Sequence, residues 1–186
     1  KAIFGAGSDL QIFHDGNNSF INELGTGSLY VRAQNTFNLQ KAGTSEFMLK
    51  TTTDGAVELY HDNSTKIATT STGVTVTGTA IATTDTDTTN TGSVTLDFGA
   101  NQNFVLTLTG NVTLANPTTE QVGQSGFIVF IQDATGGRTV SLGTDYETAG
   151  AAGLTLSTAA STTDVVPYIV AASGRILLGT PQLAFA

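Results

Sequence analysis

The chain has 186 residues, a formal net charge of −8 at pH 7 and no cysteine. The acidic balance disfavours nucleic acid and anionic lipid as partners, because both are negatively charged, and the lack of cysteine excludes disulfides and thiolate metal sites. No apolar run approaches the ~18 residues of a membrane span, and the first residues do not resemble a signal peptide. Because the chain begins at Lys1 without a Met, we expect it to be part of a longer protein.

The pattern of apolar residues predicts an all-β protein. Apolar and polar residues alternate with period two along most of the chain, and no window shows the period of a helix. Only 12% of residues are charged, and Thr, Gly, Ser and Asn fill the difference, as is typical of strands and tight turns. We expect a repetitive β-shaft over 1–79, a Thr/Asp-rich linker over 80–92 and a C-terminal head over 93–186.

The first region contains two near copies of one motif. They are DLQIFHDGNNSFI, Asp9–Ile21, and AVELYHDNSTKIA, Ala56–Ala68, and they hold both histidines of the chain. Between them, FNLQKAGTSEFML, Phe37–Leu49, follows the same plan of strand, polar turn and strand, and GSLYVRA and GVTVTGT predict further short strands. Repetition indicates a shaft or solenoid. Each unit has too few apolar residues to close its own core, so we expect three chains to share one.

The rest of the chain predicts a linker and a more globular unit. The segment AIATTDTDTTNTG, residues 80–92, has almost no apolar content and indicates a linker or an extended crossover. NFVLTLTGNVTLAN predicts a hairpin that turns at Gly110-Asn111, and the apolar run Phe127–Ile131 predicts a strand buried on both faces. GLTLS, DVVPYIVAAS and GRILLG predict three more strands, with Pro167 at an edge or a bulge. Seven to nine short strands favour a β-sandwich of jelly-roll type.

Part of the shaft region is similar to a known family. The first motif, and especially DGAVELYHDNSTKIATTSTGVTVTGT (Asp54–Thr79), resembles a repeat of tail-fibre and related fibre-like structural proteins of marine bacteriophages, and Thr69–Gly78 match its TTSTGV-V-G tail. The segment from NFVLTLTGNVTL through GRILLG resembles a terminal domain of such proteins. The resemblance implies a homotrimeric β-fibre on the virion, at the tail or the capsid surface, with a distal knob that takes part in attachment. A region before Lys1 would then bind other virion proteins.

The His-Asp pairs could indicate metal or acid–base chemistry. Three copies of His14 or His61 could meet on the axis of a trimer and bind a metal, and a His–carboxylate dyad could transfer protons. Strand parity instead places each His beside its apolar neighbours, at the rim of the core. We therefore expect both histidines to pack at strand ends and Asp15 and Asp62 to cap turns, with no metal and no cofactor. Calcium at the Asp15 turn is disfavoured because no distal Glu follows.

Catalytic signals are weak. Asp145 and Glu147 share one strand face and could form the acid pair of a polysaccharide-degrading spike, but such pairs are common on exposed edges. No nucleophile elbow or phosphate-binding loop appears. We expect no enzymatic activity.

Receptor contacts are expected in the loops of the head, at 116–124, 133–138 and 144–153. The candidate residues are Arg138, Tyr146 and Arg175, although a solvated loop with an ion pair explains them too. Together with the attachment role that the resemblance to phage fibre proteins implies, we expect host attachment by non-covalent binding to a surface glycan or protein, with three heads adding avidity. Two alternatives remain: a purely structural virion fibre or capsid-decoration protein, and a depolymerising tailspike.

Overall fold

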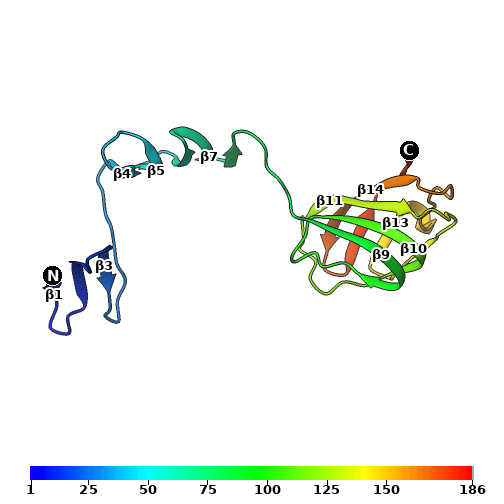
Figure 1. The fold of residues 1–186 in the computed structure, drawn as a ribbon, viewed down its shortest axis with the longest axis horizontal. Coiled ribbons are helices and arrows are strands. Elements are labelled where there is room, and N and C mark those ends of the chain that lie inside the picture. The colour runs from blue at the N-terminus through cyan, green and yellow to red at the C-terminus, as the bar shows by residue number, and fades with distance from the viewer. Residues whose placement is uncertain (186) are drawn as a thin grey trace. The chain divides into compact units, whose positions relative to one another are not determined.

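The structure is a computed structural model that describes residues 1–185. It consists almost entirely of strands and turns, which confirms the all-β prediction (Figure 1). The chain forms two compact units, Lys1–Ala80 and Ile81–Ala186. Among the residues described, no helix is long and apolar enough to cross a membrane.

The N-terminal unit begins with a three-stranded antiparallel sheet of β1 (Ala2–Phe4), β2 (Leu10–His14) and β3 (Ser19–Glu23). Phe13 and Phe20 lie opposite each other on β2 and β3, and their rings stack 4.9 Å apart. At the turn between these strands, Asp15 Oδ1 accepts hydrogen bonds from the backbone N–H groups of Asn17 (2.8 Å) and Asn18 (2.7 Å). This is the expected turn, in which a short acidic side chain satisfies the backbone.

A second sheet in the same unit is a five-stranded antiparallel meander. Its strands are β4 (Thr36–Gln40), β5 (Phe47–Thr52), β6 (Val57–His61), β7 (Ser64–Thr70) and β8 (Gly73–Val76). The predicted strand–turn–strand units are confirmed. Asp62 and Asn63 both adopt left-handed φ values, 50° and 55°, as a two-residue hairpin of type I′ requires. The strand predicted in GSLYVRA is wrong: residues 28–33 lie outside any strand and are exposed, because no neighbouring segment pairs with them.

One face of the five-stranded sheet carries a continuous row of apolar side chains. The strand register places these residues directly opposite one another on successive strands, in the order Leu39, Leu49, Leu59, Ile67 and Val76. We call this row the apolar ladder. Leu59 is 41% exposed, Ile67 39% and Val76 47%, and not one of residues 1–80 is buried. The ladder therefore lacks a cover from within residues 1–80.

The opposite face of this sheet is polar at its centre. Lys50 and Glu58 face each other on β5 and β6 and form an ion pair of 3.5 Å, and the same row continues through Ala68 and Thr75. The centre of this face is therefore polar, whereas Tyr60, on the same side of β6 as Glu58, packs its ring against that of Phe47, with 5.6 Å between the centroids.

The C-terminal unit contains one eight-stranded sheet with a curled appearance in Figure 1. Its order is β12-β10-β11-β14-β15-β13, with β9 also paired to β10 and β16 to β14. The bounds are β9 (Thr84–Thr95), β10 (Asn103–Ala115), β11 (Ser125–Gln132), β12 (Val140–Leu142), β13 (Tyr146–Thr148), a 3₁₀ turn (Ala149–Ala151), β14 (Thr163–Ala172), β15 (Arg175–Leu178) and β16 (Gln182–Phe185). The inner face holds the core, with side chains at most 1% exposed at Phe104, Leu106, Leu108, Leu114, Ile128, Phe130, Val166, Val170 and Ile176.

Strand β10 differs most from the sequence prediction. It runs without a turn through Gly110-Asn111 and pairs in parallel with β9, β11 and β12, so the predicted hairpin is wrong. Gly110 is needed for close approach rather than for a turn, because a Cβ there would overlap the side chain of Thr91 on β9. The strands belong to one mixed sheet and not to the two antiparallel sheets of a jelly roll.

Most of the predicted linker is also a strand. Residues 84–92 lie in β9, where the β-branched Thr residues favour extended backbone despite their polarity. Asn90 is the one side chain of this segment that is buried, and its Nδ2 donates to the backbone carbonyl of Thr107 on β10, 3.1 Å away. The segment thus edges the sheet instead of connecting two parts.

Pro167 lies inside the sheet, on the interior strand β14. Its carbonyl accepts from the N–H of Gly179 (2.8 Å), beyond the end of β15, while β16 pairs further along at Thr163 and Val165. The missing N–H of proline therefore falls at the junction of two partner strands, where Pro167 and Gly179 are joined by the carbonyl bond alone. The strand expected in GLTLS is not formed.

A substitution at Gly110 tests the pairing of β9 with β10. We expect Gly110→Ala to lower the free energy of unfolding by about 1–3 kcal/mol, because the added methyl group overlaps Thr91. A Thr91→Ala background removes part of that overlap and should reduce the penalty. Urea unfolding of the four proteins of this cycle measures the coupling; strictly additive effects would contradict the pairing.

Asp164 tests the connection between the core and the surrounding loops. It is 1% exposed, and its carboxylate accepts from Ser157 N (2.6 Å), Ser157 Oγ (2.7 Å) and Ala184 N (2.8 Å). Asp164→Ala should cost about 3 kcal/mol or more, since it leaves buried donors without partners. Urea unfolding followed by tyrosine fluorescence measures this, with the exposed Asp85→Asn as a control that stays near wild type.

Candidate receptor-binding surface

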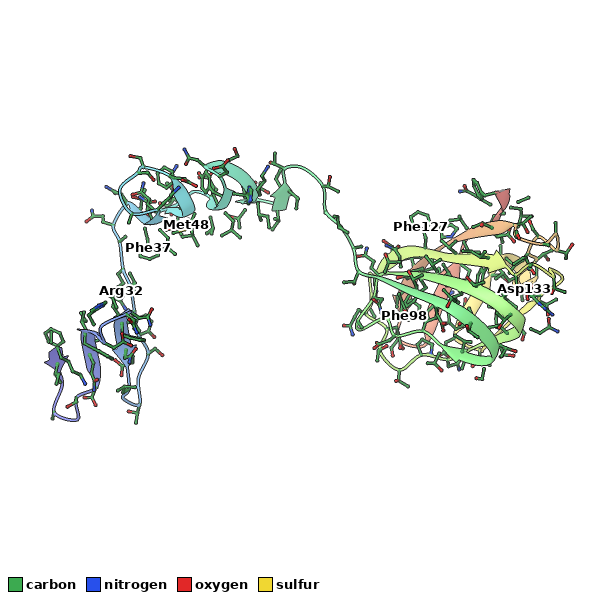
Figure 2. The ribbon with its side chains drawn as sticks, in the orientation of Figure 1. Arg32, Phe37, Met48, Phe98, Phe127 and Asp133 are labelled. Atoms are coloured by element: carbon green, nitrogen blue, oxygen red, sulfur yellow. The ribbon has the colours of Figure 1, made fainter. Side chains whose placement is uncertain are left out.

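Arg138 is held by its own loop. This loop connects β11 with β12, and Arg138 Nη2 lies 2.8 Å from Asp133 Oδ2. Asp133 Oδ1 also accepts from the backbone N–H groups of Thr135 (3.0 Å) and Gly136 (2.9 Å), and Gln132 Oε1 accepts from Arg138 N (2.9 Å). The hydrogen bonds from Arg138 hold the pKa of Asp133 below its ordinary value. Asp133 lies at the periphery of the domain in Figure 2.

Arg175, near the other end of β14, is also held in an ion pair. It lies on β15, and its Nε and Nη2 donate to the two carboxylate oxygens of Glu147 on β13, at 2.8 and 3.1 Å. The pair is bidentate and about half exposed. Hydrogen bonding from Arg175 lowers the pKa of Glu147. A raised pKa is what a general acid needs, so this arrangement does not favour Glu147 in the acid pair considered with Asp145.

Tyr146, also predicted to contact a receptor, is a core residue with little surface of its own to offer. It is 5% exposed, and it sits opposite Ile176 on the inner face. Burial raises the pKa of its phenol well above the ordinary value. The alternation of the sequence could have shown this: Glu147 and Arg175 take the outward positions, so the residues next to them point inward.

The structure does not bring the candidates into one site. The Arg138 loop follows β11 at the end where Ile131 pairs with Thr163, and Arg175 pairs with Ala172 at the other end of β14. The ten residues of β14 separate these ends, which corresponds to roughly 30 Å. The two arginines therefore belong to opposite ends of the sheet.

The histidines are hairpin positions. His14 lies opposite Ser19, and its Nδ1 is 3.2 Å from Ser19 Oγ; His61 lies opposite Ser64 in the same place of its own hairpin. Residues 1–185 contain no group of three or more His, Cys, Asp or Glu side chains that could hold a metal ion.

Two hollows in the C-terminal unit were not expected from the sequence. One, of about 300 Å³, is mainly apolar and is lined by residues that include Leu154, Leu178, Pro181 and Leu183. The other, of about 460 Å³, lies beside Tyr146 and Glu147. The first hollow forms where residues 148–155 meet residues 178–183, next to the parallel pairing of β13 with β15. The second is lined by residues 142–153 alone. No local signal in either segment encodes that pairing.

Comparison with known proteins supports a class for the chain. Residues 91–174, from within β9 almost to β15, match the family model described as "Putative phage tail fibre C-terminal domain". None of the curated proteins and none of the solved structures compared with the chain matches it. The match supports a bacteriophage tail-fibre protein, and hence a virion protein of the tail. It concerns the C-terminal unit, so the marine origin of the shaft repeat stays a prediction.

The loop ion pair can be tested by titration. Because the folded-state pKa of Asp133 is lowered, its contribution to stability is present above the unfolded pKa and is lost as pH falls through the folded pKa. In Arg138→Gln the pKa of Asp133 should rise toward 3.8, so the gap between its folded and unfolded pKa closes and its contribution to stability shrinks. Carboxyl ¹³C NMR measures both values. The matched control, Arg175→Gln, should raise the pKa of Glu147 and leave Asp133 unchanged; the same shift at Asp133 in both variants would contradict the assignment.

Proposed function

We propose that the chain is a homotrimeric fibre protein whose N-terminal unit forms a shaft shared by three chains and whose C-terminal unit is a head that attaches the virion to a host-surface glycan or protein. One observation carries the shared shaft: not one of residues 1–80 is buried, although the apolar ladder aligns five apolar side chains across the sheet.

Energetics favour a shaft made of several chains. Ordering each residue costs roughly 1–2 kcal/mol, and a sheet with both faces in water has little to offset it. Burying a Leu or Ile side chain contributes about 1.5–3 kcal/mol, and the ladder of each chain offers five such positions. Three chains that turn their ladders toward one axis enclose a core that no single chain provides.

Attachment through the head is supported by the match to a tail-fibre terminal domain. A trimer presents three copies of any site on the head, so weak individual contacts gain from avidity. The proposal includes no catalytic step.

A purely structural fibre is the second candidate, and a specific observation favours it. Both candidate arginines are held in ion pairs within the head, and Tyr146 is buried. The residues expected to contact a receptor therefore do not form a free cluster.

A charge in the apolar ladder tests the shared shaft. We expect Leu59→Asp to dissociate the assembly and to remove the β-structure signal of residues 1–80, because three carboxylates would be placed in the common core. Thr75→Asp puts the same charge on the polar face of the same sheet and should leave the assembly intact. Sedimentation equilibrium and circular dichroism measure both; equal behaviour of the two variants would contradict the shared core.

Binding to whole cells and glycan arrays separates attachment from a structural role. The labelled full chain should bind saturably to host cells, and dissociation by Leu59→Asp should weaken binding by about 10²-fold through lost avidity. A chain that assembles but binds no cell or glycan would favour the structural fibre, and cleavage of the bound polysaccharide would favour the tailspike.

A further inference from the structure

The head has an apolar sheet face that the C-terminal unit itself leaves uncovered. The run Phe127–Ile131 predicts burial on both faces, but only the inner residues, Ile128 (0% exposed) and Phe130 (1%), are buried. On the other side of β11, Phe127 is 49% exposed and points away from the domain (Figure 2). Packing within the C-terminal unit thus explains why Ile128 and Phe130 are apolar, but it does not explain the apolar residues on the other side of β11.

The strand register extends this half into a patch across four strands. Val129 pairs with Val105 on β10 and with Val165 on β14, Phe127 pairs with Pro167, and Ile169 pairs with Leu177 on β15. We define the outer face as the residues Val105, Phe127, Val129, Ile131, Val165, Pro167, Ile169 and Leu177. Ile169 is 46% exposed and the remaining members are partly exposed. A hollow of about 310 Å³ is lined in part by Pro167, Ile169 and Leu177.

The outer face carries no charge among these positions. Toward β9 it continues into Thr84 and Thr86, which pair with β10, and at the opposite edge Glu147 and Arg175 neutralise each other. Copies of a chain with net charge −8 repel one another. An uncharged apolar patch with a polar rim is the surface through which such copies can meet at low electrostatic cost.

The size of the face indicates the kind of partner. The eight outward positions, each taking about 4.8 Å across the strands and about 6.6 Å along a strand, cover roughly 250 Å². A patch of that size is no larger than those on ordinary monomers, and it is about a third of the ~800 Å² per partner that a stable independent pair buries. It suits partners that another interface already holds at high effective concentration, which is the situation of heads at the end of one shared shaft.

We propose that the outer face is the contact between neighbouring heads of the assembled fibre, and that its occupant is a second copy of this chain. The inference rests on the proposed function for one premise, that a shared shaft brings the heads together. It assigns Phe127 and Ile169 to assembly, and it leaves the loops at the ends of the sheet for receptor contacts.

The absence of native cysteine allows a clean test in the full chain. Phe127→Cys places one thiol on the outer face, and Val122→Cys places one on an exposed loop, where Val122 is 67% exposed. In the assembled protein, we expect the thiol of F127C to react with a maleimide at least about tenfold more slowly than that of V122C, because access requires the contact to open. A short bismaleimide should join chains of F127C and not of V122C.

The outcomes separate this inference from the proposed function. In the Leu59→Asp background, which should dissociate the chains, the thiol of F127C should react as fast as that of V122C. Protection that persists in the dissociated chain would show cover by its own chain and would overturn the contact. Equal reactivity in an assembled protein would overturn the contact alone and leave the shared shaft standing. A wild-type chain that does not assemble would overturn both.

Discussion

A single-layered sheet with an apolar face must find a second layer to cover that face. In the N-terminal unit, the apolar ladder lies on one side of five strands and the Lys50–Glu58 pair on the other. The hairpins specify this sheet locally, through turns at Asp15 and at Asp62-Asn63. Nothing within residues 1–80 buries it. Burial of the ladder by further chains would supply the stability that this sheet lacks, and this is the basis of the proposed fibre.

The C-terminal unit buries the apolar side chains of one face of its own sheet and leaves those of the other face exposed. Parallel pairing of β10 with β9, β11 and β12 brings distant segments together, and the inner face closes into a core with fully buried Phe104 and Ile128. The outer face around Phe127 remains open. Both units therefore contain uncovered apolar positions, and one assembly can cover both.

Much of the shaft could be predicted from the sequence, because its structure is local. The His-Asp motifs were recognisable as hairpins from their alternation and turn residues, and the structure confirms the turns at Asp15 and Asp62. The head was less predictable because its pairings are distant. Gly110-Asn111 has the composition of a hairpin turn, but here Gly110 permits the approach of Thr91. Tyr146 was assigned to the surface because the alternation of β13 was overlooked: consecutive residues of a strand point to opposite faces, and Glu147 takes the outward one. The ion pairs of Arg138 and Arg175 were anticipated as an alternative to receptor contacts, whereas their partners were not.

The most direct test of the central claim is the solution mass of the wild-type chain of residues 1–186, measured by multi-angle light scattering. The shared-core shaft predicts a mass three times that of the 19.1 kDa chain, independent of dilution over the range in which the fold is retained. A folded monomer of 19.1 kDa with an intact five-stranded sheet would contradict it, because that sheet would then be stable with its apolar ladder in water.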